Sequence, residues 1–198
     1  IIETNTFSST TVSMADYHVE EYVREMNLAA VKLARDLADE YTAKNPDKPR
    51  FVAGSVGPTN KTCSMSPDVN NPAYRALSYD ELAASYQQQM EAMLEGGVDA
   101  ILIETIFDTL NAKAAIFAAE QAMKATGVEV PVMLSVTVSD IGGRTLSGQT
   151  LDAFLASVQH ANIFSVGLNC SFGARQLKPF LEQLAARAPY YISAYPNA

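Results

Sequence analysis

The sequence predicts an α/β fold in which strands and helices alternate, as in a TIM-type β/α barrel. Three observations support this prediction. Six short apolar runs have the composition of strands buried on both faces, five helical segments separate them, and nearly every run ends in polar residues. A doubly wound sheet would gather its polar residues at one switch point, whereas polar residues at every strand end favour a barrel mouth. Six strand–helix units are two short of a closed barrel, so the barrel is expected to be incomplete.

The first half of the chain is expected to hold three strands and two long helices. Apolar residues at three- and four-residue steps predict a helix from Asp16 to about Lys44, which Asn45-Pro46 ends. A serine cap at Ser78 and the carboxylate of Glu81 predict the start of a second helix, which stops at 96–97. The strands are expected at 1–7, 51–56 and 100–105. Residues 60–77 form a loop of a length that is usually functional.

The second half continues the alternation. Asp108 or Thr109 is expected to cap a helix over 110–125, which Gly127 ends. A strand over 131–138 and a glycine-containing loop then lead to a helix over about 151–161. The remaining elements are a strand at 163–170, a helix at 174–188 and a strand at 190–194. No linker or low-complexity segment divides the chain, so residues 1–198 are interpreted as a single, partial barrel domain.

Composition and charge exclude some classes of function. The net charge of −8 argues against a general nucleic-acid binder, which needs a basic face. No apolar run is long enough to span a bilayer, so no membrane partner is expected. The two cysteines, Cys63 and Cys170, argue against a disulfide scaffold and favour a reducing compartment, which predicts a cytoplasmic location.

The two cysteines are also the candidate metal ligands. Cys170 ends the run Gly167-Leu168-Asn169-Cys170, where it is either a small buried core residue or one ligand of a metal. Cys63 is interpreted as a partly exposed thiol of the long loop. His18 and His160 fall on predicted helices away from the strand ends and are not assigned as ligands.

Glu104 is the strongest single signal for a polar site. It follows the buried run at 101–103, where a lone carboxylate is costly unless it is paired or solvated. The residue therefore either forms a structural ion pair or provides a counter-charge or general base for a substrate. Asn5 and Asn169 occupy similar strand ends, where each either caps a turn or orients a polar ligand.

The strand ends carry six short motifs, which are Glu3-Thr4-Asn5, Gly57-Pro58-Thr59, Glu104-Thr105-Ile106-Phe107-Asp108, Gly143-Arg144-Thr145, Gly167-Leu168-Asn169-Cys170 and Pro196-Asn197-Ala198. Together these motifs resemble the homocysteine S-methyltransferase family, and the resemblance extends in order over the whole chain. Two longer runs, at 57–62 and 108–115, are similar to the homocysteine-binding module of cobalamin-dependent methionine synthases.

The resemblance implies an eight-fold barrel that holds zinc through three cysteines, of which Cys170 matches one. The other two are an adjacent pair on the last strand of the family's barrel, which this chain does not contain, and its first strand is absent as well. Glu104 matches the residue that holds the homocysteine amino group, and Asn169 and Asn5 match positions near the substrate. No residue of the chain is assigned a catalytic proton-transfer role.

The same resemblance implies an enzyme of methionine biosynthesis. Zinc would activate the homocysteine thiol to accept a methyl group from methylcobalamin, which another module of the same polypeptide carries beside a folate module. Two alternatives stay open: a stand-alone enzyme that uses a betaine or sulfonium donor, or a fragment that is inactive alone. For the isolated chain, open strand edges predict self-association or marginal stability, and a single thiolate predicts no stoichiometric zinc.

Overall fold

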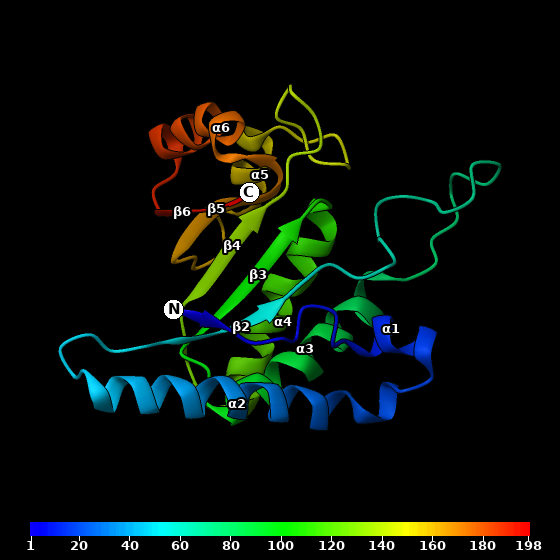
Figure 1. Ribbon diagram of the computed structural model, residues 1–198. Coiled ribbons are helices and arrows are strands. Elements are labelled where there is room, and N and C mark those ends of the chain that lie inside the picture. The colour runs from blue at the N-terminus through cyan, green and yellow to red at the C-terminus, as the bar shows by residue number, and fades with distance from the viewer.

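The computed structural model describes residues 1–198 and contains six parallel strands that alternate with helices (Figure 1). The strands are β1 (Ile2–Glu3), β2 (Val52–Val56), β3 (Ala100–Ile106), β4 (Val132–Val136), β5 (Ser165–Gly173) and β6 (Tyr191–Asn197). The α-helices are α1 (Thr11–Met14), α2 (Val23–Lys44), α3 (Tyr79–Gly96), α4 (Thr109–Thr126), α5 (Leu151–Val158) and α6 (Ala174–Arg187). None of them combines the length and hydropathy that a bilayer crossing would require.

The strands lie in the sheet in the order in which they occur in the chain, from β1 to β6. A doubly wound sheet would reverse this order at a switch point, and no reversal occurs. The sheet curls into an open half-barrel with helices packed along its outer face (Figure 1). The predicted fold class, an incomplete β/α barrel of six units, is confirmed.

The core has one large part and one small part. A cluster of 37 buried residues fills the space between the strands and the helices. A separate cluster of Ala53, Ala100 and Leu102, with Met133 packed against it, lies on the inner face of the half-barrel. The outer layer therefore provides most of the burial that stabilises the fold.

Strand β5 lies close to β6 because of one glycine. A Cβ atom placed on Gly167 would lie 2.3 Å from the carbonyl oxygen of Ser193, its partner in register on β6. Any side chain at this position would therefore push the two strands apart. Pro196 is tolerated in β6 because this strand is at the edge of the sheet, where a missing amide donor breaks no further ladder.

The predicted helix caps are present. Ser78 and Glu81 form a reciprocal capping box at the start of α3, and the Asp108 carboxylate accepts hydrogen bonds from two amides at the start of α4. Both helices end at glycines in the left-handed conformation, Gly97 and Gly127. These ends were predictable because the capping interactions are local in sequence.

Helix α2 begins later than predicted and buries small side chains. The α-helix begins at Val23 rather than at Asp16, and two short 3₁₀ turns precede it, at Ala15–Tyr17 and Glu20–Tyr22. Its buried positions include the small residues Ala30, Ala34 and Ala38, whereas Leu33 and Leu37 are 64% and 53% exposed. Small side chains on the inner face let α2 approach its neighbours closely, and this packing outweighs the burial of larger ones.

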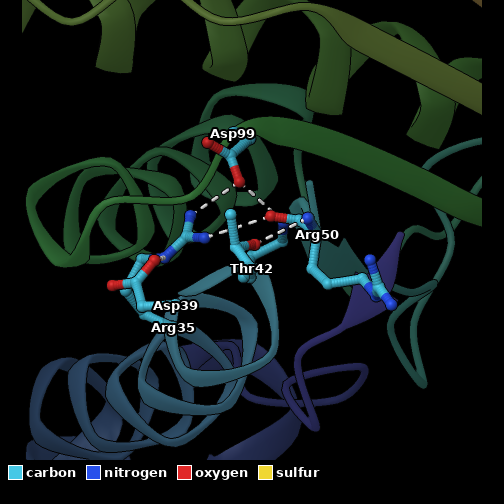
Figure 2. Close-up of polar contacts among 6 residues, drawn as sticks. Arg35, Asp39, Thr42, Arg50 and Asp99 are labelled. Carbon is cyan, nitrogen blue, oxygen red and sulfur yellow. Dashed lines mark hydrogen bonds and ion pairs between the residues drawn. The ribbon is translucent and has the colours of Figure 1, made fainter. Parts of the chain in front are cut away.

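A polar cluster ties α2 to the starts of β2 and β3 (Figure 2). The Asp99 carboxylate accepts hydrogen bonds from Arg35 Nη1 at 2.6 Å and from the Val52 amide at 2.7 Å. Arg35 also donates to the Arg50 carbonyl at 3.3 Å, and the Arg50 amide donates to Thr42 Oγ1 at 2.8 Å. One carboxylate therefore anchors a helix and a neighbouring strand together.

Replacement of Asp99 by asparagine is expected to lower the free energy of unfolding by about 2 kcal/mol, because the two hydrogen bonds to its oxygen lose the negative charge that strengthens them. Urea denaturation of both proteins measures the change. Asp36→Asn is the matched control, since its pair with Lys32 on the same helix is exposed and contributes little. Equal losses in the two variants would contradict the anchoring role of Asp99.

Candidate functional site

The inner face of the half-barrel carries a group of polar side chains where the middle strands end. In a β/α barrel, the carboxyl ends of the strands form the face on which active sites are built. The group contains Ser55 of β2, Glu104 and Thr105 of β3, Ser135 and Thr137 from β4 and the segment after it, and Asn169 and Cys170 of β5. Hydrogen bonds connect its members in two neighbouring sets.

Glu104 is half-buried and has a hydroxyl rather than a cation as its partner. The Ser55 hydroxyl donates a hydrogen bond to the Glu104 carboxylate. Burial raises the pKa of Glu104 above its ordinary value, the Ser55 hydrogen bond opposes this rise, and the nearby Glu3 carboxylate adds to it. No salt bridge involves Glu104, so the structural ion pair that was one interpretation of this residue is wrong.

Ser55 is itself held by the chain that follows β1. Its amide donates to Thr4 Oγ1 at 3.0 Å, and its carbonyl accepts from Thr6 Oγ1 at 2.7 Å. The two threonine hydroxyls are hydrogen-bonded to each other at 2.7 Å. The serine that contacts Glu104 therefore has a fixed backbone position. Sequence reasoning missed Ser55 because a single serine inside an apolar strand has no distinguishing pattern.

Asn169 is the centre of the second set and contacts two other strands. Its Oδ1 accepts from the Thr105 amide at 3.1 Å and from Ser135 Oγ at 2.8 Å. Its Nδ2 donates to Thr105 Oγ1 at 2.8 Å and to Cys170 Sγ at 3.1 Å. The side chain is buried and its amide atoms contact three protein groups and a thiol. Asn169 therefore joins strands rather than capping a turn, which was one interpretation from sequence, and its role in orienting a polar ligand stays a prediction.

The backbone is strained at the residues that follow Glu104 and Asn169. Thr105 and Cys170 have φ values of 56° and 58°, and Ser171 follows at 59°. Each left-handed residue other than glycine costs on the order of 1 kcal/mol, and β-branched threonine is a particularly unfavourable case. The pairing register shifts at the same places, between Ile103 and Ile106 on β3 and between Asn169 and Gly173 on β5. Bulges of this kind redirect side chains at the ends of strands.

Cys170 combines partial exposure with a defined position. Its thiol sulfur lies 3.1 Å from Asn169 Nδ2 and 4.0 Å from Thr105 Oγ1. The side chain is half-buried rather than enclosed in the core. The interpretation of Cys170 as a small buried core residue is therefore wrong, and its role as a metal ligand stays a prediction.

Cys63 has the opposite environment from its predicted one. The side chain is 7% exposed, so the interpretation as a partly exposed loop thiol is wrong. Its amide donates to Asn111 Oδ1 at 2.9 Å, and Asn111 Nδ2 donates to the Lys61 carbonyl at 3.0 Å. Burial, with Asp108 and Glu81 adding to it, raises the pKa of the Cys63 thiol and makes it less reactive.

The remaining candidates lie outside the two connected sets. Asn5 is exposed after β1 and takes no part in these hydrogen bonds. His18 ends a 3₁₀ turn and His160 follows α5, and both are exposed. Arg144 donates to the Gly148 carbonyl at 2.9 Å within its own loop. No group of three or more His, Cys, Asp or Glu side chains comes together as a possible metal centre.

Comparison with known families and structures gives a consistent result. The family model described as homocysteine S-methyltransferase matches residues 1–198. The homocysteine methyltransferase MmuM from Escherichia coli has the same fold: its metallated form superposes with a TM-score of 0.79 at 22% identity, over 99% of this chain. Its oxidised form gives a TM-score of 0.80 at 23% identity, also over 99% of this chain. The chain spans 66% and 65% of the lengths of these two structures.

Proposed function

The chain belongs to the homocysteine S-methyltransferase family, and on this premise we propose that its strand ends bind homocysteine and help to prepare the substrate thiol for methylation. The observation that carries the proposal is the position of the Glu104 carboxylate. Glu104 is half-buried, has no cationic partner, and directly precedes Thr105, which is hydrogen-bonded to the residue next to Cys170. A carboxylate and a thiol joined through one network suit a substrate that carries an ammonium group and a sulfur atom.

Glu104 binds the ammonium group of homocysteine in this proposal. A half-buried carboxylate without a cationic partner is unfavourable, and a cationic substrate group relieves that cost by pairing with it. The Ser55 hydroxyl occupies one carboxylate oxygen and orients the group, leaving the other oxygen to accept from the substrate. Glu104 thus fixes the position of the substrate and transfers no proton.

Cys170 contributes one thiolate ligand to zinc in this proposal. A zinc site needs at least three protein ligands, and residues 1–198 provide only this one thiol at the strand ends, so the chain alone does not fit a complete zinc site. The other ligands would come from outside these residues. When bound, zinc stabilises the deprotonated form of a thiol near neutral pH. Asn169 Nδ2 donates to the Cys170 sulfur and holds it in place.

The methyl donor in the proposed reaction is methylcobalamin, carried by another module of the same polypeptide beside a folate module, and the product is methionine. The runs at 57–62 and 108–115 support this assignment over a betaine or sulfonium donor. Asn5 is proposed as a further residue near the substrate. Two free cysteines, one half-exposed, support a reducing cytoplasmic location.

The donor assignment is tested by supplying the full-length protein with zinc, homocysteine and one donor at a time. Methionine measured by mass spectrometry is expected with methylcobalamin and not with betaine or a sulfonium compound. If methionine formed only with betaine or the sulfonium compound, methylcobalamin would be wrong as the donor, and homocysteine would still be the acceptor. Absence of methionine with all three would contradict the proposed function.

A further inference from the structure

Three side chains join strands that are not all neighbours. Thr105 of β3 and Asn169 of β5 are linked by two hydrogen bonds, of 3.1 Å and 2.8 Å, although β4 lies between their strands. Ser135 of β4 donates to the same Asn169 oxygen at 2.8 Å. We call these residues the Thr105–Ser135–Asn169 clamp. It spans the inner face of the sheet where the strands end.

The clamp residues Thr105 and Asn169 are the chain neighbours of the two groups proposed to hold the substrate. Glu104 precedes Thr105 in the chain, and Cys170 follows Asn169. Thr105 and Cys170 both have a strained, left-handed backbone conformation. Such conformations persist only where surrounding contacts hold them. Thr105 is itself a member of the clamp, and Cys170 is held by a further hydrogen bond of 3.1 Å that the Asn169 side chain donates to its sulfur.

We propose that the Thr105–Ser135–Asn169 clamp fixes the span between the Glu104 carboxylate and the Cys170 thiol, and thereby selects homocysteine over cysteine. The inference rests on the proposed function, in which one group binds the ammonium end and the other directs the sulfur end. The two amino acids differ by one methylene between these ends. Thr105, Ser135 and Asn169 act as positioning residues that need not touch the substrate.

The physical reason is rigidity. A site that holds two anchors at a fixed separation accepts one chain length, whereas a site whose anchors move accepts both. Discrimination over a single methylene is typically about tenfold to two-hundredfold. Without the Thr105 hydroxyl, Asn169 Nδ2 loses an acceptor, and the strained backbone at Thr105 loses one of the two bonds that tie it to Asn169.

The span is tested first in the metal-free chain with thiol reagents of two lengths. 2-Aminoethyl and 3-aminopropyl methanethiosulfonate each transfer their aminoalkylthio group to a thiolate, with loss of methanesulfinate. Their neutral ethyl and propyl counterparts correct for intrinsic reactivity. Peptide mapping by mass spectrometry follows Cys170 separately from the buried Cys63. After correction, the charged pair is expected to differ in rate by about tenfold in the wild type.

Three variants identify the source of that difference. Thr105→Val keeps the shape and removes the hydroxyl, so the rate ratio is expected to approach one. Thr105→Ser restores the hydroxyl and should restore the ratio. Glu104→Gln removes the carboxylate that binds the ammonium group, so the rate ratio of the two charged reagents should approach one while the rates of the neutral reagents stay unchanged. An unchanged ratio in Thr105→Val, with a normal circular dichroism spectrum, would overturn the inference.

The second measurement is calorimetric titration of the zinc-supplied full-length protein with homocysteine and with cysteine. Thr105→Val is expected to narrow the wild-type preference for homocysteine by about tenfold. An unchanged preference would contradict the role of the clamp and leave the proposed function standing. If the wild type binds neither amino acid, the homocysteine assignment is wrong, while the reagent rates still decide whether the clamp fixes the span.

Discussion

Replacement of Cys170 by alanine is expected to abolish zinc binding and to lower methyl transfer in the full-length protein by about a thousandfold or more. The reason is that a metal contributes several kcal/mol of transition-state stabilisation, and each 1.4 kcal/mol is about tenfold in rate. Metal analysis after dialysis and a methionine assay measure the two effects.

The other cysteine is the matched control for this experiment. Cys63→Ser changes a buried thiol in the loop before α3, and it is expected to retain zinc and turnover with a modest loss of stability. Retention of zinc and turnover in Cys170→Ala would remove Cys170 from the site. Equal losses in both variants would indicate a folding defect instead.

Replacement of Glu104 by glutamine is expected to weaken homocysteine binding by about a hundredfold, because removing one partner of a buried charge pair costs about 2–5 kcal/mol. Calorimetric titration of the zinc-supplied full-length protein measures the change. Ser55→Ala should have a smaller effect, since it removes only the hydrogen bond that orients the carboxylate. Glu120→Gln, an exposed substitution on α4, is the control. Unaltered affinity in Glu104→Gln would rule out Glu104 as the ammonium partner.

The stability of the folded protein is expected to depend on pH, and the raised pKa of Glu104 determines the sign of this dependence. Between the ordinary carboxyl pKa and the raised one, the folded state binds more protons than the unfolded state, so stability falls as pH increases through this window. At neutral pH, Glu104→Gln is therefore expected to be more stable than the wild type, and the difference should vanish at pH values below the window. Thermal melts of both proteins across pH measure it. A constant difference at all pH values would contradict this explanation.

The affinity for homocysteine should change with pH for the same reason. As pH falls, the carboxylate becomes protonated at a higher pH than an unperturbed glutamate would, and ammonium binding is lost there. The burial of Glu104 therefore lowers the stability of the free protein at neutral pH. The same burial makes pairing of the carboxylate with a cation favourable.

Much of the architecture could be predicted from the sequence because its signals are local. The apolar runs, the capping residues Ser78 and Asp108 and the helix-ending glycines lie next to the elements that they define. The polar strand ends, Glu104 and Cys170 among them, distinguished a barrel mouth from a single switch point. The same placement marked Glu104 as a candidate, whereas Cys170 could be assigned as a metal ligand only through the family resemblance.

The sequence by itself thus determined the alternation of strands and helices, their approximate bounds and two residues at the ends of strands. Only the tertiary structure decided which face of α2 is buried, that Cys63 is enclosed, and that Thr105 and Asn169 meet across β4. The physical reason is the range of the interactions. Periodicity and capping depend on neighbours a few positions apart, whereas the curl and register of the sheet bring together residues 64 positions apart, as Thr105 and Asn169 are.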